Sequence, residues 1–331
     1  MYDHYIALDW AQQNMAIARM TRESSTIKSI NVASSLKELQ LYLSHLRGKK
    51  ILTFEETSTS QWLYVELKEY ADEILICDPY RNHLLSDGPK TDELDATKLV
   101  QLLRGNFLKP VFHSANEFSD LRKLVSGYED VVKAGVRLKN QRTSLFRAQG
   151  KGKGEKSLPQ KLDRFVLEGV DQGIEAYEKE KTRYEAEMER QRRKHLMIRN
   201  LDEIFGIGVI GAVKIVARVV DARRFEDKGK WLSYCGLVRH QKLSGGKSYG
   251  WRGSRYCRTL KSVFKTAALS VIVGRSRNSF KDYYEFLLKE KHCAEHEARH
   301  AVARRIATIA WAVMKSGKPF DPKKMSKGSQ N

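Results

Sequence analysis

Four acidic residues in the first third of the chain have the types and positions that metal-dependent phosphodiester chemistry needs. Asp9 closes the apolar run YIALDW, and Glu55 closes KKILTFEE. Asp92 and Asp95 lie three residues apart in KTDELDATKL, so they share a face if that segment is helical. Converging carboxylates repel one another. Two hard cations would relieve that cost, activate an attacking oxygen and stabilise a leaving oxygen. We therefore predict a two-metal site at these acids.

Each acid taken alone has an ordinary explanation. An Asp at a strand end is often a turn residue, and acids in a first helical turn interact favourably with the helix macrodipole. The complete set, in this order on these elements, favours the metal site. Glu56 is a poorer candidate than Glu55, because strand alternation sends the two side chains to opposite faces.

Ser244, in the sequence LSGGK, is a candidate nucleophile. A serine hydroxyl attacks poorly unless a base or a metal activates it. His240 lies nearby, but no Ser/His/Asp triad spacing is visible, and Ser-Gly-Gly is commonly no more than a flexible loop. On the residues alone, both interpretations stay open for Ser244.

The segment around Ser244 is rich in glycine and in cations. Gly245 and Gly246 would let a phosphate approach the backbone closely. We expect phosphate contacts from the cations that follow, although a solvated surface is the alternative: Lys247, Arg252, Arg255, Arg258 and Lys261. The interleaved aromatic residues Tyr249, Trp251 and Tyr256 favour nucleic acid.

The segment LDEIFGIGVIGAVKIVARV has the pattern of a helix, a glycine turn and a second helix. This pattern predicts a helix-hairpin-helix. In that motif the backbone N–H groups around Gly206 and Gly208 would approach a DNA phosphate.

The charge of the chain is large and unevenly distributed. Of the 331 residues, 60 are Lys or Arg and 40 are Asp or Glu, which gives a formal net charge of +20. Residues 1–100 carry −4, residues 101–200 carry +8 and residues 201–331 carry +16. The basic part favours a polyanionic partner, because cations that neutralise phosphates release counterions. An acidic module facing phosphate would require a divalent cation between them.

Cysteine spacing and hydropathy indicate the cellular compartment of the protein. The four cysteines, Cys77, Cys235, Cys257 and Cys293, contain no CxxC pair, which indicates reduced thiols. No signal peptide begins the chain and no apolar run is long enough to span a membrane. We expect a cytoplasmic protein without membrane contact.

The order of predicted elements in the first hundred residues indicates an α/β fold. Strands are expected at 5–10, 15–22, 25–33, 49–56 and 73–79, with helices at 34–48, 61–71 and 90–105. Three strands before the first helix, followed by alternating units, are typical of an RNase H-like mixed sheet. A Rossmann fold is disfavoured, because no GxGxxG follows the first strand.

The rest of the chain is predicted to be mainly helical. Residues 114–150 and 155–200 have helical periodicity and a Gly/Lys break between them. We interpret them as an antiparallel coiled-coil arm that could make dimer contacts, the alternative being two ordinary helices packed on the sheet. The predicted domains are 1–112, catalytic; 113–200, the arm; and 201–331, a basic domain containing Ser244.

Several of these segments together resemble the DEDD-type insertion-sequence transposases, which are bridge-RNA-guided DNA recombinases with a RuvC-like N-terminal domain. The resemblance extends over nearly the whole chain. Its motifs are YIALD, FEETSTS, KTDELDATKL, IFGIG, CGLVRHQKLSGGK, RGSRYCRTLKSVFKTAA and VMKSGKPFD. Phe205 and Arg239 stand where the family usually has prolines, which concerns local loop geometry and leaves the acids and the serine in place.

The resemblance implies a composite site and a set of partners. Asp9, Glu55, Asp92 and Asp95 would bind two magnesium ions, and Ser244 would form a covalent phosphoserine link to DNA. A structured RNA from the element would select donor and target DNA, and the assembly would be a homo-oligomer, a dimer or tetramer. The alternatives are an RNase H-like nuclease or junction resolvase without a covalent step, and a nucleic-acid-binding scaffold with a degenerate site.

Overall fold

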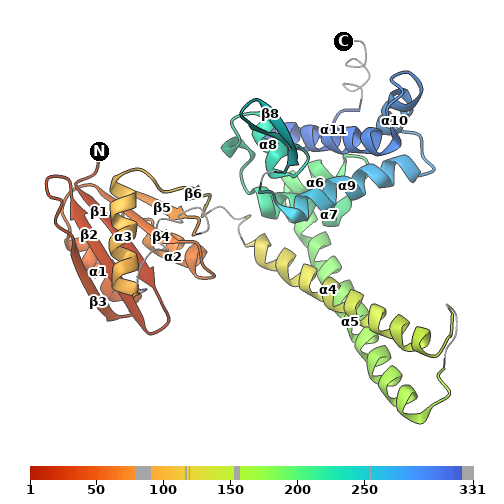
Figure 1. Ribbon diagram of the computed structural model, residues 1–331, viewed down its shortest axis with the longest axis horizontal. Coiled ribbons are helices and arrows are strands. Elements are labelled where there is room, and N and C mark those ends of the chain that lie inside the picture. Colours follow the sequence, from red (N-terminus) through yellow and green to blue (C-terminus); the bar gives the residue numbers. More distant parts are fainter. Residues whose placement is uncertain (80–90, 116–117, 119, 153–156, 254, 323–331) are drawn as a thin grey trace. The chain divides into compact units, whose positions relative to one another are not determined.

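The structure, a computed structural model, describes residues 1–79, 91–115, 118, 120–152, 157–253 and 255–322 (Figure 1). The chain divides into two compact units, Met1–Asn116 and Glu117–Asn331. The helices of the predicted arm share a hydrophobic core with the basic segment that follows them. The division into three domains therefore stays a prediction.

The first unit is built on a mixed six-stranded sheet with the order β3-β2-β1-β4-β5-β6. β1 pairs antiparallel with β2 and parallel with β4, as the RNase H-like interpretation requires. β4 and β5 are parallel, whereas β2–β3 and β5–β6 are antiparallel. The strands are β1 His4–Trp10, β2 Asn14–Thr21, β3 Lys28–Ala33, β4 Lys50–Glu55, β5 Glu73–Cys77 and β6 Pro110–Val111.

Three helices cover the two faces of this sheet, and strand alternation decides which residues they meet. Ile6, Leu8, Leu52 and Phe54 pack with α1 (Leu36–His45) and α2 (Ser60–Leu67). Ala7, Ala16, Ala18 and Ile51 pack on the opposite face with α3 (Asp92–Arg104). Figure 1 shows α3 lying across the strands. The expected α/β class is confirmed, and the strand order is compatible with an RNase H-like fold.

The two longest helices, α4 (Leu121–Ala148) and α5 (Lys161–Lys194), pack side by side as an antiparallel pair (Figure 1). Their contacts run in opposite sequence directions. The Tyr128 hydroxyl donates to Glu185 at 2.9 Å, Arg142 to Asp171 at 2.7 Å and Gln149 to Asp163 at 2.7 Å. Coiled-coil geometry and dimer contacts stay predictions.

Among the described residues, the remainder of the second unit packs six α-helices and a short 3-10 helix around one core, and it carries an exposed β-hairpin. At its centre the buried indole of Trp231 donates to the Ala307 carbonyl at 2.8 Å. The elements are α6 Leu196–Asp202, α7 Gly208–Val219, η3 Ala222–Arg224, α8 Lys228–Tyr234, β7 His240–Ser244, β8 Lys247–Arg252, α9 Arg258–Val273, α10 Ser279–Lys289 and α11 Glu295–Ser316.

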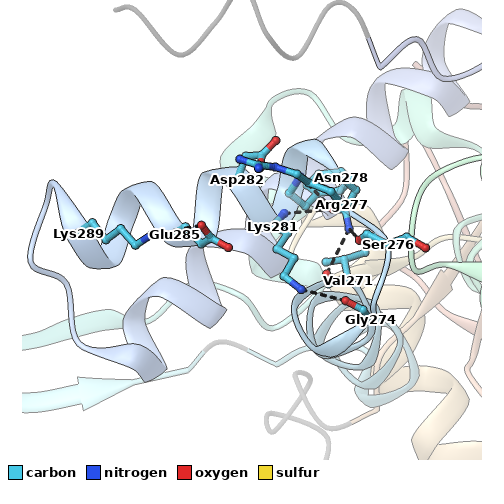
Figure 2. Close-up of polar contacts among 10 residues, drawn as sticks. Val271, Gly274, Ser276, Arg277, Asn278, Lys281, Asp282, Glu285 and Lys289 are labelled. Carbon is cyan, nitrogen blue, oxygen red and sulfur yellow. Dashed lines mark hydrogen bonds and ion pairs between the residues drawn. The ribbon is translucent and has the colours of Figure 1, made fainter.

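One asparagine organises the turn between α9 and α10. The side-chain oxygen of Asn278 accepts from the backbone N–H groups of Phe280 and Lys281, and its amide nitrogen donates to the Val271 carbonyl at 3.2 Å. Lys281 reaches back to the Gly274 carbonyl at 2.9 Å, which ties the two helices together (Figure 2). The turn thereby satisfies backbone groups that both helix ends leave unpaired.

Across the described ranges, no helix combines the length and apolar character that a membrane crossing requires.

Candidate functional site

Asp9 lies near the end of β1 and on the side of the sheet that α3 covers. Its strand neighbours Ile6 and Leu8 belong to the core under α1 and α2, whereas Ala7 packs toward α3. Alternation along the strand therefore sends Asp9 to the same side as Ala7. The sequence prediction that Asp9 closes the first strand agrees with the observed strand His4–Trp10.

The first turn of α3 presents the two later acids. Thr91 caps the helix by accepting from the Leu94 N–H at 3.3 Å, so the helix begins at Asp92. Asp92 is exposed and Asp95 is half-buried one turn further along. The Oδ1 atom of Asp95 is buried and has no hydrogen-bond partner. Such an atom carries a desolvation cost that a bound cation would offset.

The electrostatics of Asp9 link these three acids. Burial raises the pKa of the Asp9 carboxyl to about 6, and the negative charges of Asp92 and Asp95 raise this pKa further in the same direction. Carboxylates repel one another measurably only when little water separates them. The structure therefore brings Asp9, Asp92 and Asp95 to one edge of the sheet.

Glu55 is placed on the same face by the register of β1 and β4. The parallel ladder aligns Ala7 with Thr53, and both continue for two residues to Asp9 and Glu55. Ile51, four residues before Glu55, packs in the core under α3, so alternation directs Glu55 to that side as well. Glu55 therefore lies on the same side of the sheet as Asp9.

The adjacent acid, Glu56, has a different partner. Its carboxylate lies 3.1 Å from Nε2 of His113, whose side chain is 3% exposed, and the imidazole ring of His113 neighbours the ring of Tyr64 on α2. This contact accounts for Glu56 in structural terms. His113 was not anticipated from the sequence, where it is a single histidine outside any periodic segment.

The donor set fits a hard divalent cation in its chemistry. All four residues offer carboxylate oxygens. The Oδ1 atom of Asp95 has no hydrogen-bond partner, and burial together with two neighbouring acids raises the pKa of Asp9. Among the described residues, however, no three His, Cys, Asp or Glu side chains lie close enough together to hold an ion as they stand. Binding a cation would therefore require the carboxylates to rotate inward.

Ser244 lies in a β-hairpin, where the sequence suggested a flexible loop. It is the last residue of β7 and pairs with Lys247, the first residue of β8. Gly245 and Gly246 form the two-residue turn with φ values of +55° and +75°, which is the geometry of a tight hairpin turn. The Ser244 side chain is exposed.

The predicted phosphate-binding cations follow Ser244 along β8 and into α9. Lys247 and Arg258 are exposed, and Arg255 lies exposed between the two elements. The ammonium group of Lys261 lies 4.2 Å from the centre of the Tyr256 ring, a cation–π contact. The side chain of Arg252 lies outside what the structure describes.

The two glycines of the predicted helix-hairpin-helix differ in their surroundings. Gly206 has φ +87°, and a Cβ atom there would lie 2.5 Å from the Ala267 carbonyl oxygen on α9. Glycine is therefore required at position 206 so that the turn can pack against α9. The sequence did not reveal this reason for the glycine. Gly208, with φ +63°, has no atom within 4 Å of the position a Cβ would take. A phosphate contact at either glycine stays a prediction.

A half-buried carboxylate on α4 connects three helices of the second unit. Glu129 accepts from Arg218 on α7 at 2.9 Å and from the Thr259 hydroxyl on α9 at 2.9 Å. Lys214 on α7 lies 3.8 Å from the same carboxylate, and burial lowers the pKa of this lysine. Sequence analysis missed Glu129, because an isolated Glu in a charged helix carries no distinguishing pattern.

Two family models match this chain, one over the segment with the four acids and one over the segment with Ser244. Residues 6–148, which contain the four acids, match the DEDD transposase model of the IS110 type. Residues 198–285, which contain Ser244 and the cations after it, match the transposase IS116/IS110/IS902 family. A search of curated proteins found no match. The two family matches together cover more than two thirds of the chain, and this protein belongs to the IS110 family of DEDD transposases.

Proposed function

We propose that this transposase cuts and rejoins DNA with a composite site made of the four acids and Ser244. The observation that carries the proposal is the electrostatic coupling of Asp9 to Asp92 and Asp95 at one sheet edge. A carboxyl whose pKa is raised by burial and by neighbouring acids is a frequent signature of a functional site. Their metal-free arrangement is strained by charge, which favours a divalent cation as the resident partner.

Asp9, Glu55, Asp92 and Asp95 would hold the metal, for which two magnesium ions are the expected occupants. Bound there, magnesium would stabilise the charge that develops on a phosphodiester during cleavage. The chain's own contribution is to orient the carboxylates. Backbone pairing with β2 fixes the position of Asp9, pairing with β5 fixes that of Glu55, and the Thr91 cap fixes the first turn of α3.

Ser244 would act as the nucleophile. Its hydroxyl oxygen bonds to phosphorus, the bond from phosphorus to the leaving deoxyribose oxygen breaks, and the proton of Ser244 passes to the released hydroxyl. In the second step a hydroxyl of another DNA strand attacks the phosphoserine and regenerates Ser244. Each step exchanges one phosphodiester for another, so strands are rejoined without an external energy source.

The expected partners follow from the family and from the charge of the chain. DNA is the substrate of the transposase family. We further propose a structured guide RNA, a homo-oligomer that assembles the composite site, and a cytoplasmic location. Sequencing the RNA that co-purifies with the protein tests the guide. A single element-derived transcript is expected, whereas random cellular RNA would contradict it.

Replacement of Ser244 distinguishes covalent recombination from hydrolysis. Ser244→Ala should abolish the detergent-resistant protein–DNA adduct and strand transfer. Ser248→Ala on the neighbouring strand is the matched control and should retain both. If Ser244→Ala still cuts DNA at the wild-type rate, the protein is a metal-dependent nuclease or junction resolvase that uses water.

A further inference from the structure

The hairpin that contains Ser244 has one extra residue in its second strand. Leu243 pairs with Ser248, and Gln241 pairs with Trp251, so between these two pairs β7 has one residue and β8 has two. Tyr249 and Gly250 therefore lie together opposite Lys242, and Gly250 has φ +90°. This is a β-bulge whose conformation favours glycine.

Strand alternation and the bulge together place the side chains of the hairpin on two different faces. Directly paired residues share a face, as do alternate residues of a regular strand. One face therefore carries Gln241, Leu243, Ser248 and Trp251, and the bond from the Gln241 amide to the Ser248 hydroxyl at 2.9 Å agrees with this assignment. The opposite face, here called the serine face, carries Lys242, Ser244, Lys247 and Tyr249.

The serine face is cationic and contains one large aromatic ring. The Tyr249 side chain is 67% exposed, and the hairpin presents all four residues to solvent. The other face is uncharged, and its Trp251 and Leu243 are 66% and 65% exposed. A lysine on either side of a serine with an aromatic ring beside them is a combination that binds a DNA strand, with phosphates on the cations and a base on the ring.

The surrounding sequence lacks any acid that could neutralise these cations locally. Residues 228–281 contain 13 Lys or Arg residues and no Asp or Glu. The hairpin lies within this segment, which gives its serine face a charge complementary to a phosphate backbone.

We propose that Tyr249 is a positioning residue that stacks on an unpaired DNA base next to the phosphate attacked by Ser244. This inference rests on the proposed function of Ser244. Alternation from Lys247 puts Tyr249 on the serine face, and the bulge at Gly250 moves Trp251 to the opposite face; without the extra residue, the two rings would share a face. Stacking would hold the strand so that the phosphate between Lys242 and Lys247 meets the Ser244 hydroxyl.

Binding of an unstructured DNA strand of about 20 nucleotides, labelled with 2-aminopurine, tests the proposal on the full chain. The matched controls are the same strand as a duplex and the same sequence as RNA. Loss of one stacked base costs about 1–3 kcal/mol, so Tyr249→Leu should weaken single-strand binding by about 5- to 150-fold. The variant should also lose part of the 2-aminopurine quenching seen with the wild type, while duplex affinity changes less than about twofold.

Two further variants separate stacking from folding. Tyr249→Phe keeps the ring and should restore both affinity and quenching. Trp251→Leu removes an equally exposed ring from the opposite face and should leave single-strand binding unchanged. Four results would overturn the proposal. Tyr249→Leu could bind the single strand as tightly as the wild type, lose equal affinity for single strand and duplex, or lose more affinity for RNA than for DNA. Trp251→Leu could weaken single-strand binding as much as Tyr249→Leu does.

The experiments distinguish failure of the stacking role from failure of the proposed function of Ser244. If Ser244→Ala abolishes the covalent adduct while Tyr249→Leu binds DNA normally, only the stacking role fails. If Ser244→Ala keeps the adduct, the proposed function fails, whatever the binding data show.

Discussion

The surroundings of Asp9 alter its ionisation. Its pKa of about 6 lies above the usual value of 3.8, because the carboxyl is partly buried and faces Asp92 and Asp95. The folded protein therefore holds the Asp9 proton more tightly than the unfolded chain does. In the absence of metal, the contribution of Asp9 to the free energy of unfolding falls as the pH rises from about 4 to about 6, and it levels off above that range.

Asp9→Asn removes this effect and gives the first prediction. In EDTA at pH 7.5 the variant should melt at a higher temperature than the wild type, because it carries no charge beside Asp92 and Asp95. The difference should shrink as the pH falls from about 6 to about 4, because the folded wild-type carboxyl becomes protonated over this range. Magnesium should then raise the melting temperature of the wild type more than that of the variant. Thermal melts at several pH values measure this. A difference in melting temperature between variant and wild type that does not change with pH would contradict the prediction.

Glu55 and Glu56 form a matched pair for activity. Glu55→Gln should slow strand cleavage on the order of 10³-fold, because a weakened metal ligand raises the activation free energy by several kcal/mol. Glu56→Gln should retain most activity, since Glu56 contacts His113 on another face. Cleavage rates of a labelled DNA substrate decide the matter. Equal losses in both variants would mean that alternation does not distinguish the two acids.

The acids could be predicted from sequence because their types and their places on strand ends and a helix start are local properties. Glu129 could not, since its partners Arg218 and Thr259 are 89 and 130 residues away in the chain. The raised pKa of Asp9 was likewise out of reach, because it depends on tertiary burial.

Two glycines in the helical pair α4 and α5 have opposite structural roles. A Cβ atom at Gly135 would overlap the ring of Tyr177 on the facing helix, whereas a Cβ at Gly169 would meet nothing within 4 Å. Gly135→Ala should therefore destabilise the protein by about 1–3 kcal/mol. Gly169→Ala should stabilise it by up to about 1 kcal/mol, because alanine favours the helix. Urea unfolding measures both, and equal effects would show that the two helices do not pack as described.

The cap of α10 provides another test of local structure. Asn278→Ala should lower the free energy of unfolding by about 1–2 kcal/mol, because two backbone N–H groups and the Val271 carbonyl lose their partner. Asn278→Ser keeps an acceptor for the helix and should recover part of the loss. Urea denaturation followed by circular dichroism gives the comparison, and no loss in the alanine variant would contradict the role of the cap.

Periodicity sufficed for the strands and helices of the first unit, because each buries one face and repeats at the period of its type. The two-residue strand β6 is too short to show a period. The hairpin β7–β8 was missed for a different reason. All of β7 is exposed, so no buried face marks its alternation, and the bulge at Gly250 shifts the pattern of β8.

The two units carry very different charges. The first 116 residues contain 13 Lys or Arg and 15 Asp or Glu, and the rest of the chain contains 47 and 25, so the net charges are −2 and +22. Binding of DNA by the whole chain should therefore weaken steeply with salt. An interface with six to ten phosphate contacts loses about 10³- to 10⁵-fold in affinity between 50 and 200 mM salt.

The salt dependence also locates the contacts. Replacing both Lys242 and Lys247 by Gln should reduce the slope of log affinity against log salt by about two. Lys179→Gln, which removes a cation paired with Glu175 on the arm helix, should leave the slope unchanged. Titrations by fluorescence anisotropy at several salt concentrations test this, and equal slopes for all three proteins would exclude the hairpin as a phosphate contact.

The carboxylate of Glu129 has a mechanical consequence. It sits where the long helical pair enters the body of the second unit, and it holds α7 through Arg218 and α9 through Thr259. A sideways force on the far end of that pair acts over the length of a 28-residue helix, so a small force at the tip produces a large turning moment at the base of the pair. Force from a partner bound at the tip is therefore transmitted through Glu129 to α9, the helix that begins just after the hairpin containing Ser244.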